Sequence, residues 1–143
     1  MRWKVYNVFR YLSPVLNIPE MEGRKILVID DSNTNLVLLE SLLERHGYNV
    51  FSALSAMEGL ETMKENMPDL IYLDLVMPEI DGLEFMKIIR SHHKWESIPV
   101  VMLSAVTDED IITRSKELGV IEYITKPLNI HRIVDLTKNI LAN

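Results

Sequence analysis

Residues 25–31 read Lys-Ile-Leu-Val-Ile-Asp-Asp, a short apolar run that ends in two carboxylates. A run of this kind, rich in β-branched residues, predicts a strand at residues 25–29 that is buried on both faces, as strands of parallel sheets are. Four further stretches have the same character, at residues 49–53, 70–73, 98–103 and 121–124. The chain is therefore expected to form a sheet of five buried strands.

Segments with helical periodicity separate the predicted strands. The clearest covers residues 35–46, where leucines recur on one helix face and Gly47 marks a natural end. The other predicted helices cover residues 56–66, 83–90, 108–118 and 130–141, and Thr107 is expected to cap the helix that follows it. Strands that alternate with crossover helices form right-handed βαβ units. The predicted fold class is α/β, a doubly wound five-stranded parallel sheet with five helices.

The composition bounds the chain to one globular domain and narrows its partners. Its 143 residues are 48% hydrophobic, which suffices for one core but not for two full domains. The net charge of −6 argues against direct nucleic-acid binding through a basic surface. The absence of cysteine excludes disulfides. No apolar run approaches the roughly 20 residues that span a bilayer, so we expect no stable membrane insertion and a cytoplasmic location.

The first 22 residues are expected to be an N-terminal extension of a domain that covers residues 23–143. Three basic residues outnumber one acid in residues 1–20, which therefore carry +2 whereas the rest of the chain carries −8. Apolar residues at helical spacing predict a short amphipathic helix in this segment. Met21 is a natural start for the domain, which leaves open that the extension is a non-native leader.

Reactive side chains follow four of the predicted strands, at the point where each strand ends. They are Asp30 and Asp31, Asp74, Ser104 and Lys126. Taken singly, each has a structural explanation as a helix-start residue, a loop acid, a cap or a solvated lysine. Because the carboxyl ends of parallel strands meet at one edge of the sheet, we expect these groups to converge.

Three neighbouring carboxylates raise each other's pKa unless a cation lies among them. Oxygen ligands without His or Cys favour Mg²⁺, with Mn²⁺ as a substitute, and Mg²⁺ commonly keeps water and a phosphate oxygen among its ligands. An Asp carboxylate can attack phosphorus while a metal, an ammonium and a hydroxyl stabilise the transferred oxygens. Asp74 is therefore the candidate phosphoryl acceptor, with Ser104 and Lys126 as its catalytic partners.

Four separated motifs, each at the end of a predicted strand, resemble one known family. They are Ile26-Leu-Val-Ile-Asp-Asp31, Asp74-Leu-Val-Met-Pro-Glu-Ile-Asp-Gly82, Ser104-Ala105 and Lys126-Pro127. In this order they resemble the receiver domains of two-component response regulators, over about residues 24–142. The resemblance, to single-domain regulators of the chemotaxis type, implies a flavodoxin-like fold with strand order 2-1-3-4-5.

The resemblance also implies roles for individual residues. The metal ligands would be three carboxylates and one carbonyl, namely Asp30 largely through water, Asp31, Asp74 and Val76. The phosphoryl oxygens would be held by Ser104, Lys126 and the amides of Val76 and Ala105. Ser104 and Tyr123 would form a switch that repositions on phosphorylation, and the Lys126–Pro127 peptide bond would be cis.

By this resemblance, the chain would accept a phosphoryl group on Asp74 from a histidine kinase or a histidine phosphotransfer protein and signal by protein contact. The effector would bind the face formed by the fourth helix, the fifth strand and the fifth helix. The chain would be no ordinary enzyme, since it would catalyse only its own phosphorylation and slow dephosphorylation. Val76 and Val106 stand where relatives carry polar side chains that orient the hydrolytic water, which predicts the slow rate.

Three alternatives stay open. A receiver of this kind can act as a scaffold that is never phosphorylated. An Asp-nucleophile phosphatase usually carries a second acid two residues after the nucleophile, where this chain has Val76. A flavin-binding protein of similar topology needs a phosphate-binding loop after its first strand, where Asp30 and Asp31 would repel phosphate.

Overall fold

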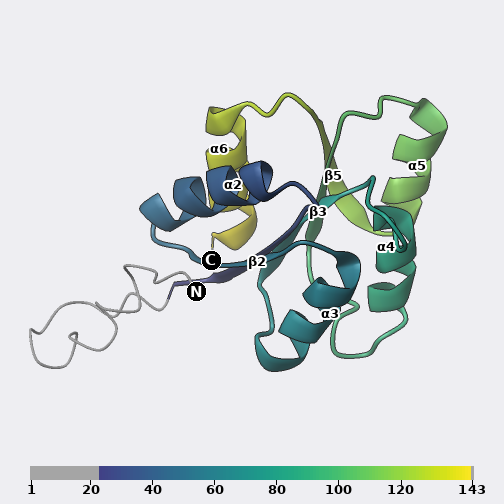
Figure 1. Ribbon diagram of the computed structural model, residues 1–143, viewed down its shortest axis with the longest axis horizontal. Helices are drawn as coiled ribbons and strands as arrows, with labels where there is room; N and C mark the ends of the chain where they lie inside the picture. The colour runs from purple at the N-terminus through teal and green to yellow at the C-terminus, as the bar shows by residue number, and fades with distance from the viewer. Residues whose placement is uncertain (1–22, 143) are drawn as a thin grey trace, which may run out of the picture.

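Five short parallel strands form the centre of the molecule, and their carboxyl ends lie at one edge (Figure 1). The computed structural model describes residues 23–142. Within this range the strands are β1 (Lys25–Ile29), β2 (Asn49–Ala53), β3 (Leu70–Asp74), β4 (Val100–Ser104) and β5 (Val120–Thr125). Their order across the sheet is β2-β1-β3-β4-β5, and every neighbouring pair is parallel. The predicted α/β class, sheet type and strand order are confirmed.

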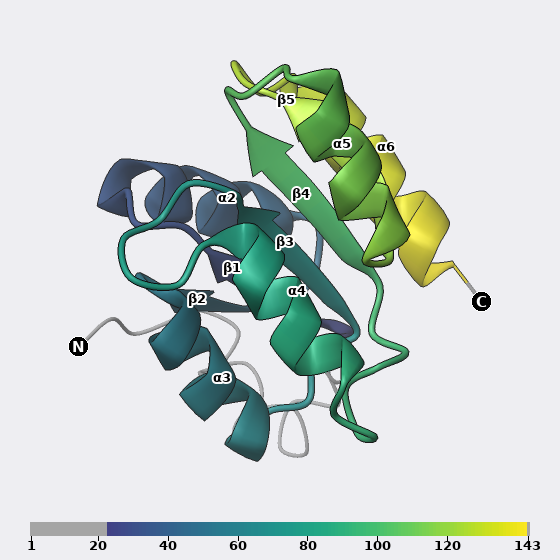
Figure 2. The same ribbon diagram turned by 90° about the vertical axis from the view of Figure 1, so that its right-hand side faces the viewer.

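Five helices cover the two faces of this sheet in the described part of the chain. They are α2 (Asn33–Arg45), α3 (Ala56–Glu65), α4 (Gly82–Arg90), α5 (Glu109–Glu117) and α6 (Ile130–Leu141). Helices α2 and α6 lie on one face, and α3, α4 and α5 lie on the other (Figures 1 and 2). The helices therefore enclose the strands and leave the strand ends accessible.

The alternation of side chains along each strand divides the core into two halves. In β1, Leu27 and Ile29 pack with residues of α3 and α4, whereas Ile26 and Val28 pack with residues of α2 and α6. All four side chains are at most 1% exposed. Because both faces are covered, β1 is apolar throughout its buried length, and the first polar side chain after it falls at the sheet edge.

The helix ends follow capping chemistry, with one correction to the sequence prediction. Gly47 follows α2 with a φ of 91° and its N–H donates to the carbonyl of Glu44, as expected of a helix-ending glycine. Helix α5 is capped by Asp108 and not by Thr107, so that prediction was wrong. The Asp108 carboxylate accepts the N–H groups of Asp110 and Ile111, and this short acidic side chain supplies the oxygen that the helix start requires.

The predicted extension, residues 1–22, and its amphipathic helix lie outside the described residues. Within the part of the chain that the structure describes, no helix has both the length and the apolar character needed to cross a bilayer.

Candidate functional site

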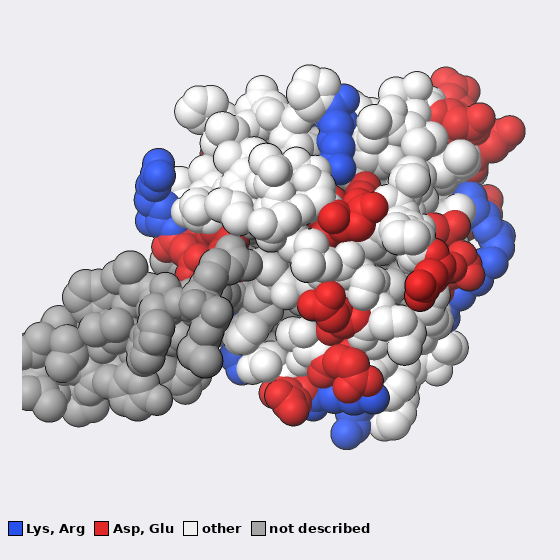
Figure 3. Space-filling view, viewed as in Figure 1, with Lys and Arg blue, Asp and Glu red and all other residues white. Residues whose placement is uncertain are grey.

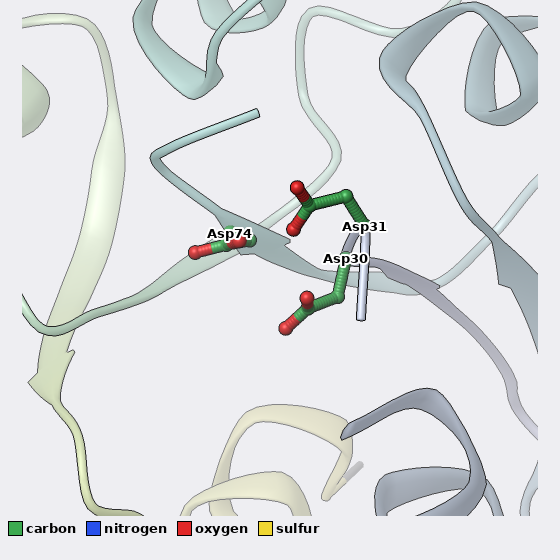
Figure 4. A group of neighbouring side chains, drawn as sticks. All are labelled: Asp30, Asp31 and Asp74. Carbon is green, nitrogen blue, oxygen red and sulfur yellow. The ribbon is translucent and has the colours of Figure 1, made fainter. Parts of the chain in front are cut away.

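Three carboxylates gather where β1 and β3 end side by side. Residue Ile29 of β1 is paired with Leu73 of β3, so the next residues along the two strands are Asp30 and Asp74. One carboxylate oxygen of each of Asp30, Asp31 and Asp74 lies within 4.8 Å of the others. Figure 4 shows Asp30 and Asp31 extending from the end of β1 toward the side on which Asp74 lies. The predicted convergence of these three residues is what the structure has.

This position in the sheet is one where a cleft can open. The chain passes from β1 to β2 on one side and returns to β3 on the other, so the strand order reverses between β1 and β3. Connections leave such a point in opposite directions, and ligands bind there in open α/β sheets. The topology therefore places the carboxylates at the location where a ligand has access to them.

Asp30 is held by contacts that its own loop provides. Its Oδ1 accepts the N–H of Ser32, and its Oδ2 accepts an N–H of the Asn35 side chain at 3.1 Å. It is only 2% exposed. Ser32 is the residue that caps α2, with its hydroxyl accepting the N–H of Asn35. Asp30 thus supports the start of α2 and also faces the site, whereas the capping itself belongs to Ser32.

Asn35 is a site residue that the sequence analysis missed. Its side-chain amide orients the Asp30 carboxylate from the first turn of α2. A polar residue one turn into an otherwise leucine-rich helix, five positions after the first aspartate, was the available signal. The signal is weak because an asparagine near a helix start usually has a local role.

Lys126 connects the end of β5 to the carboxylates. Its ammonium Nζ lies 3.3 Å from Asp30 Oδ2 and 3.4 Å from Asp74 Oδ1. Its backbone N–H donates to the carbonyl of Ser104, which ties β5 to the end of β4. The Lys126–Pro127 peptide bond is cis, as the resemblance implied. One cation therefore bridges two of the three acids.

The electrostatic balance at Asp74 remains unfavourable for its charged form. The pKa of Asp74 is raised from its usual 3.8 to about 6. Burial is the main cause, because the side chain is only 8% exposed. The carboxylate of Asp30 raises the pKa as well, and the opposing effect of Lys126 does not offset the two. A single ammonium does not neutralise the acids, which leaves room for a further cation.

The donor set fits a hard divalent cation. Asp30, Asp31 and Asp74 offer carboxylate oxygens close to one another, with Asp31 exposed to solvent and the other two buried. Neither His nor Cys belongs to this group, and oxygen-only sets suit Mg²⁺ or Mn²⁺. Repulsion from Asp30 is the second cause of the raised pKa of Asp74, after burial, and a bound cation would relieve that repulsion.

Ser104 and Tyr123 both bind one residue of the loop after β4. The Ser104 hydroxyl accepts the N–H of Val106 at 3.0 Å, and the Tyr123 hydroxyl donates to the carbonyl of Val106 at 2.7 Å. Ser104 is 1% exposed and Tyr123 is 8% exposed, so both side chains point inward. The backbone of Val106 therefore joins the two predicted switch residues, a link that their sequence positions did not reveal.

The loop after β3 is shaped by a glycine. Gly82 donates its N–H to the carbonyl of Leu75, and a Cβ atom at Gly82 would lie 2.9 Å from both the Asp74 carbonyl oxygen and the Leu75 Cα. Only glycine permits so close an approach. Asp81 then starts α4 with a capping box that includes Glu84. This arrangement returns the chain tightly to the sheet and leaves Val76 at the edge, with its side chain 61% exposed.

Comparison with known proteins connects this geometry with a family. The family model described as the response regulator receiver domain matches residues 26–138. Sporulation initiation phosphotransferase F of Bacillus subtilis is 35% identical over 121 residues, which cover 85% of this chain and 96% of the relative. The polar-differentiation response regulator DivK of Brucella ovis is 29% identical over 120 residues, 84% of this chain and 98% of its own.

Solved structures show the same architecture. The chemotaxis protein CheY4 of Vibrio cholerae superposes with a TM-score of 0.79 at 27% identity, over 83% of this chain and 99% of its own. A putative response regulator from Chloroflexus aurantiacus superposes with the same TM-score at 34% identity, over 85% and 100% of the two chains. The similarity thus extends over almost the whole length of each of these proteins.

Proposed function

The chain belongs to the response regulator receiver domain family, and from this membership we propose that it accepts a phosphoryl group on Asp74 and reports it to a protein partner in the cytoplasm. One observation carries the proposal. The buried carboxylate of Asp74 lies among two other carboxylates and one ammonium, which is 3.4 Å from it. The two neighbouring carboxylates destabilise the charged form of Asp74 in the fold, whereas a phosphoryl acceptor that binds a cation makes use of them.

In the proposed step, an oxygen of the Asp74 carboxylate forms a bond to phosphorus while the bond between phosphorus and a histidine nitrogen of the donor breaks. The electron pair stays on that nitrogen. The other ring nitrogen keeps its proton, so the donor side chain departs as a neutral imidazole. Asp74 must be ionised to attack. Since its pKa is about 6, the carboxylate is mostly charged at pH 7 even before a cation binds.

The neighbours of Asp74 would hold the incoming group. The Lys126 ammonium, already beside Asp74, would pair with a phosphoryl oxygen, and the Ser104 hydroxyl and the amides of Val76 and Ala105 would bind the others. Mg²⁺ held by Asp31, Asp74 and the Val76 carbonyl, with Asp30 acting largely through water, would neutralise charge on the transferred oxygens. Such a chain promotes only its own phosphorylation and dephosphorylation and is no ordinary enzyme.

The readout would begin at Val106, whose backbone both switch residues bind. A Ser104 hydroxyl that turns toward a phosphoryl oxygen would release the N–H of Val106, and the loop before α5 would shift. Tyr123 would follow, because it holds the carbonyl of the same residue. We therefore place the effector on the face formed by α5, β5 and α6. The donor would be a histidine kinase or a histidine phosphotransfer protein, in keeping with a relative named as a phosphotransferase.

The acceptor is tested by intact mass after incubation with acetyl phosphate, with and without Mg²⁺. We expect a Mg²⁺-dependent gain of one phosphoryl group in the unaltered chain and in Asp135→Asn, a control at an exposed position of α6. Asp74→Asn should show no gain. An unmodified mass under every condition would instead favour a scaffold that is never phosphorylated.

A second prediction concerns the lifetime of the phosphorylated state. Val76 is 61% exposed and Val106 half-buried beside the site, and neither side chain can orient a water molecule for attack on phosphorus. Val106→Asn should shorten the lifetime roughly tenfold, since positioned polar groups contribute at least this much to proton transfer. The lifetime is measured as the loss of phosphorylated protein with time in Mg²⁺. Val37→Asn, at an exposed position of α2, is the control. An unchanged lifetime in Val106→Asn would contradict the explanation.

A further inference from the structure

A small apolar pocket lies beside the acidic site, where the chain enters α4 and α5. Its volume is about 300 Å³, at the lower end of ligand pockets. Six apolar residues line it, with Asp81 as the one acidic member: Leu75, Val76, Met77, Leu83, Val106 and Ile111. The proposed phosphoryl chemistry uses none of these side chains, so the pocket requires its own explanation.

The walls of this pocket run from the core to solvent. Leu75 and Met77 belong to the buried core, Leu83 and Ile111 pack against it as partly buried residues, and Val76 is 61% exposed. Helices α4 and α5 lie side by side on this face (Figure 2). Apolar surface that opens to water and is bordered by polar residues can serve as an interaction site.

The two segments that line the pocket are rich in acidic residues and contain no basic residue. Residues 74–84 and 104–111 supply the whole lining, and together they contain no Lys, Arg or His. They contain seven acids, namely Asp74, Glu79, Asp81, Glu84, Asp108, Glu109 and Asp110. Among described residues, only Asp74 of these seven forms an ion pair. Figure 3 shows acidic side chains at the upper right of the view, where α5 begins in Figure 1.

From the apolar lining and its acidic border we propose that the pocket is a docking site for a partner protein segment that inserts one apolar side chain flanked by Lys or Arg. The apolar side chain would fill the volume between Val76, Val106 and Ile111. The flanking cations would pair with the acids of these two segments that form no ion pair, which favours such a partner over a neutral or acidic one. The proposal does not rest on phosphoryl transfer and holds for the unphosphorylated protein.

The test uses the full chain without Mg²⁺ or phosphodonor and a synthetic amphipathic peptide of twelve Leu and Lys residues. A matched peptide with Glu in place of Lys is the negative probe. We expect the Lys peptide to shift backbone amide signals mainly in residues 75–84 and 104–111, and the Glu peptide to shift none. Binding constants from fluorescence anisotropy at several salt concentrations then quantify the contribution of charge.

Two variants of the protein separate the apolar and the ionic parts. Ile111→Trp fills the pocket. It should weaken binding of the Lys peptide about tenfold, which is the effect expected when one apolar side chain is no longer buried. Glu109→Gln combined with Asp110→Asn changes two exposed positions of α5. This double variant should bind the Lys peptide about threefold more weakly, and its binding constant should depend less on salt concentration. The matched control is Glu61→Gln with Glu65→Gln on α3, also exposed, which should leave the binding constant unchanged.

Three results would overturn the proposal. The amide shifts could spread over the acidic surface or centre on the α5, β5 and α6 face. The α3 control could lose as much affinity as the α5 variant, which would mean unspecific attraction. Finally, a synthetic peptide of residues 1–20, itself apolar and basic, could bind the pocket more tightly than the Lys peptide, which would make this chain its own occupant. Because Ile111→Trp alters a partly buried position, its thermal midpoint is measured alongside, and the exposed α5 pair decides the outcome if that midpoint falls.

Discussion

The charge of Asp74 disfavours folding because the side chain is buried, but the proposed attack on phosphorus requires that charge. Its carboxylate is buried beside Asp30 and only partly compensated by Lys126, and its pKa rises to about 6. The folded protein therefore holds the proton of Asp74 more tightly than the unfolded chain does. The stabilisation from protonated Asp74 is complete below pH 3.8 and is lost as the pH rises to about 6. At neutral pH the charged side chain destabilises the metal-free fold.

Asp74→Asn is accordingly expected to stabilise the protein at pH 7 in the presence of a chelator. Asparagine keeps the size of aspartate and removes the buried charge, so the free energy of unfolding should rise by about 3 kcal/mol. Near pH 4 the difference from the unaltered chain should shrink toward zero, because Asp74 is then protonated. Urea unfolding of the variant and of the unaltered chain at pH 4 and pH 7 measures the two differences in free energy. A difference that is the same at pH 4 and pH 7 would contradict this account of the pKa.

At the scale of elements, a buried polar contact joins the strand that carries Asp74 to the last helix. The Tyr72 hydroxyl of β3 lies 2.5 Å from Thr137 Oγ1 of α6 and 3.3 Å from the carbonyl oxygen of Ile133. Thr137 and Tyr72 are both fully buried. Burial raises the pKa of Tyr72 to about 12, and the hydrogen bond with Thr137 lowers it only in part. The contact fixes how α6 sits against β3.

Thr137→Val and Tyr72→Phe test this contact as a pair. Thr137→Val leaves the buried Tyr72 hydroxyl with only the Ile133 carbonyl at 3.3 Å, which should cost about 1–3 kcal/mol of unfolding free energy. Tyr72→Phe should cost less, because the Thr137 hydroxyl keeps its 2.7 Å bond to the same carbonyl. The double variant replaces both by apolar groups of similar shape and should cost less than the sum of the two. Urea unfolding of the unaltered chain and the three variants gives the free energies of a double-mutant cycle. Strict additivity would show that the two hydroxyls do not support each other.

At the scale of the whole molecule, the fold concentrates negative charge at one edge of the sheet. The chain has 21 acidic and 15 basic residues. The three carboxylates at the ends of β1 and β3 form a close group, and within residues 23–142 only the Lys126 ammonium pairs with them. Because parallel strands all end at the same edge, this arrangement follows from the connection of β1 to β3 through α2, β2 and α3. A divalent cation at this edge would stabilise the folded state and not the unfolded chain, where the acids are far apart.

Mg²⁺ is therefore expected to raise the thermal midpoint of the protein. At one hundred times its dissociation constant, a ligand specific for the folded state adds about 2.7 kcal/mol, which corresponds to roughly 8 °C for a domain of this size. Asp31→Asn should lose most of this response while folding normally, since Asp31 is exposed. Asp135→Asn on α6 is the control for a lost surface acid. An equal Mg²⁺ response in Asp31→Asn and the control would contradict the assignment of Asp31.

Local signals predicted the elements and most of the site. The apolar run from Lys25 to Ile29 predicted a buried strand, and Asp30, Asp74 and Lys126 could be placed together because strand ends share an edge. Local signals misplaced the cap of α5, since Thr107 and Asp108 are adjacent and both suitable in type. The choice between them depends on backbone angles that packing decides.

The sequence by itself determined the fold class, the strand order through a family resemblance, and which side chains stand at the strand ends, because these follow from periodicity and from the geometry of parallel sheets. Only the tertiary structure decided which residues contact one another: Asn35 binds Asp30, the backbone of Val106 binds both Ser104 and Tyr123, and Tyr72 contacts Thr137 in the core. Tyr72 and Thr137 lie 65 residues apart, and no local pattern encodes such a distance. The physical reason is that periodicity sets the face a side chain takes, whereas its contacts depend on how neighbouring elements pack.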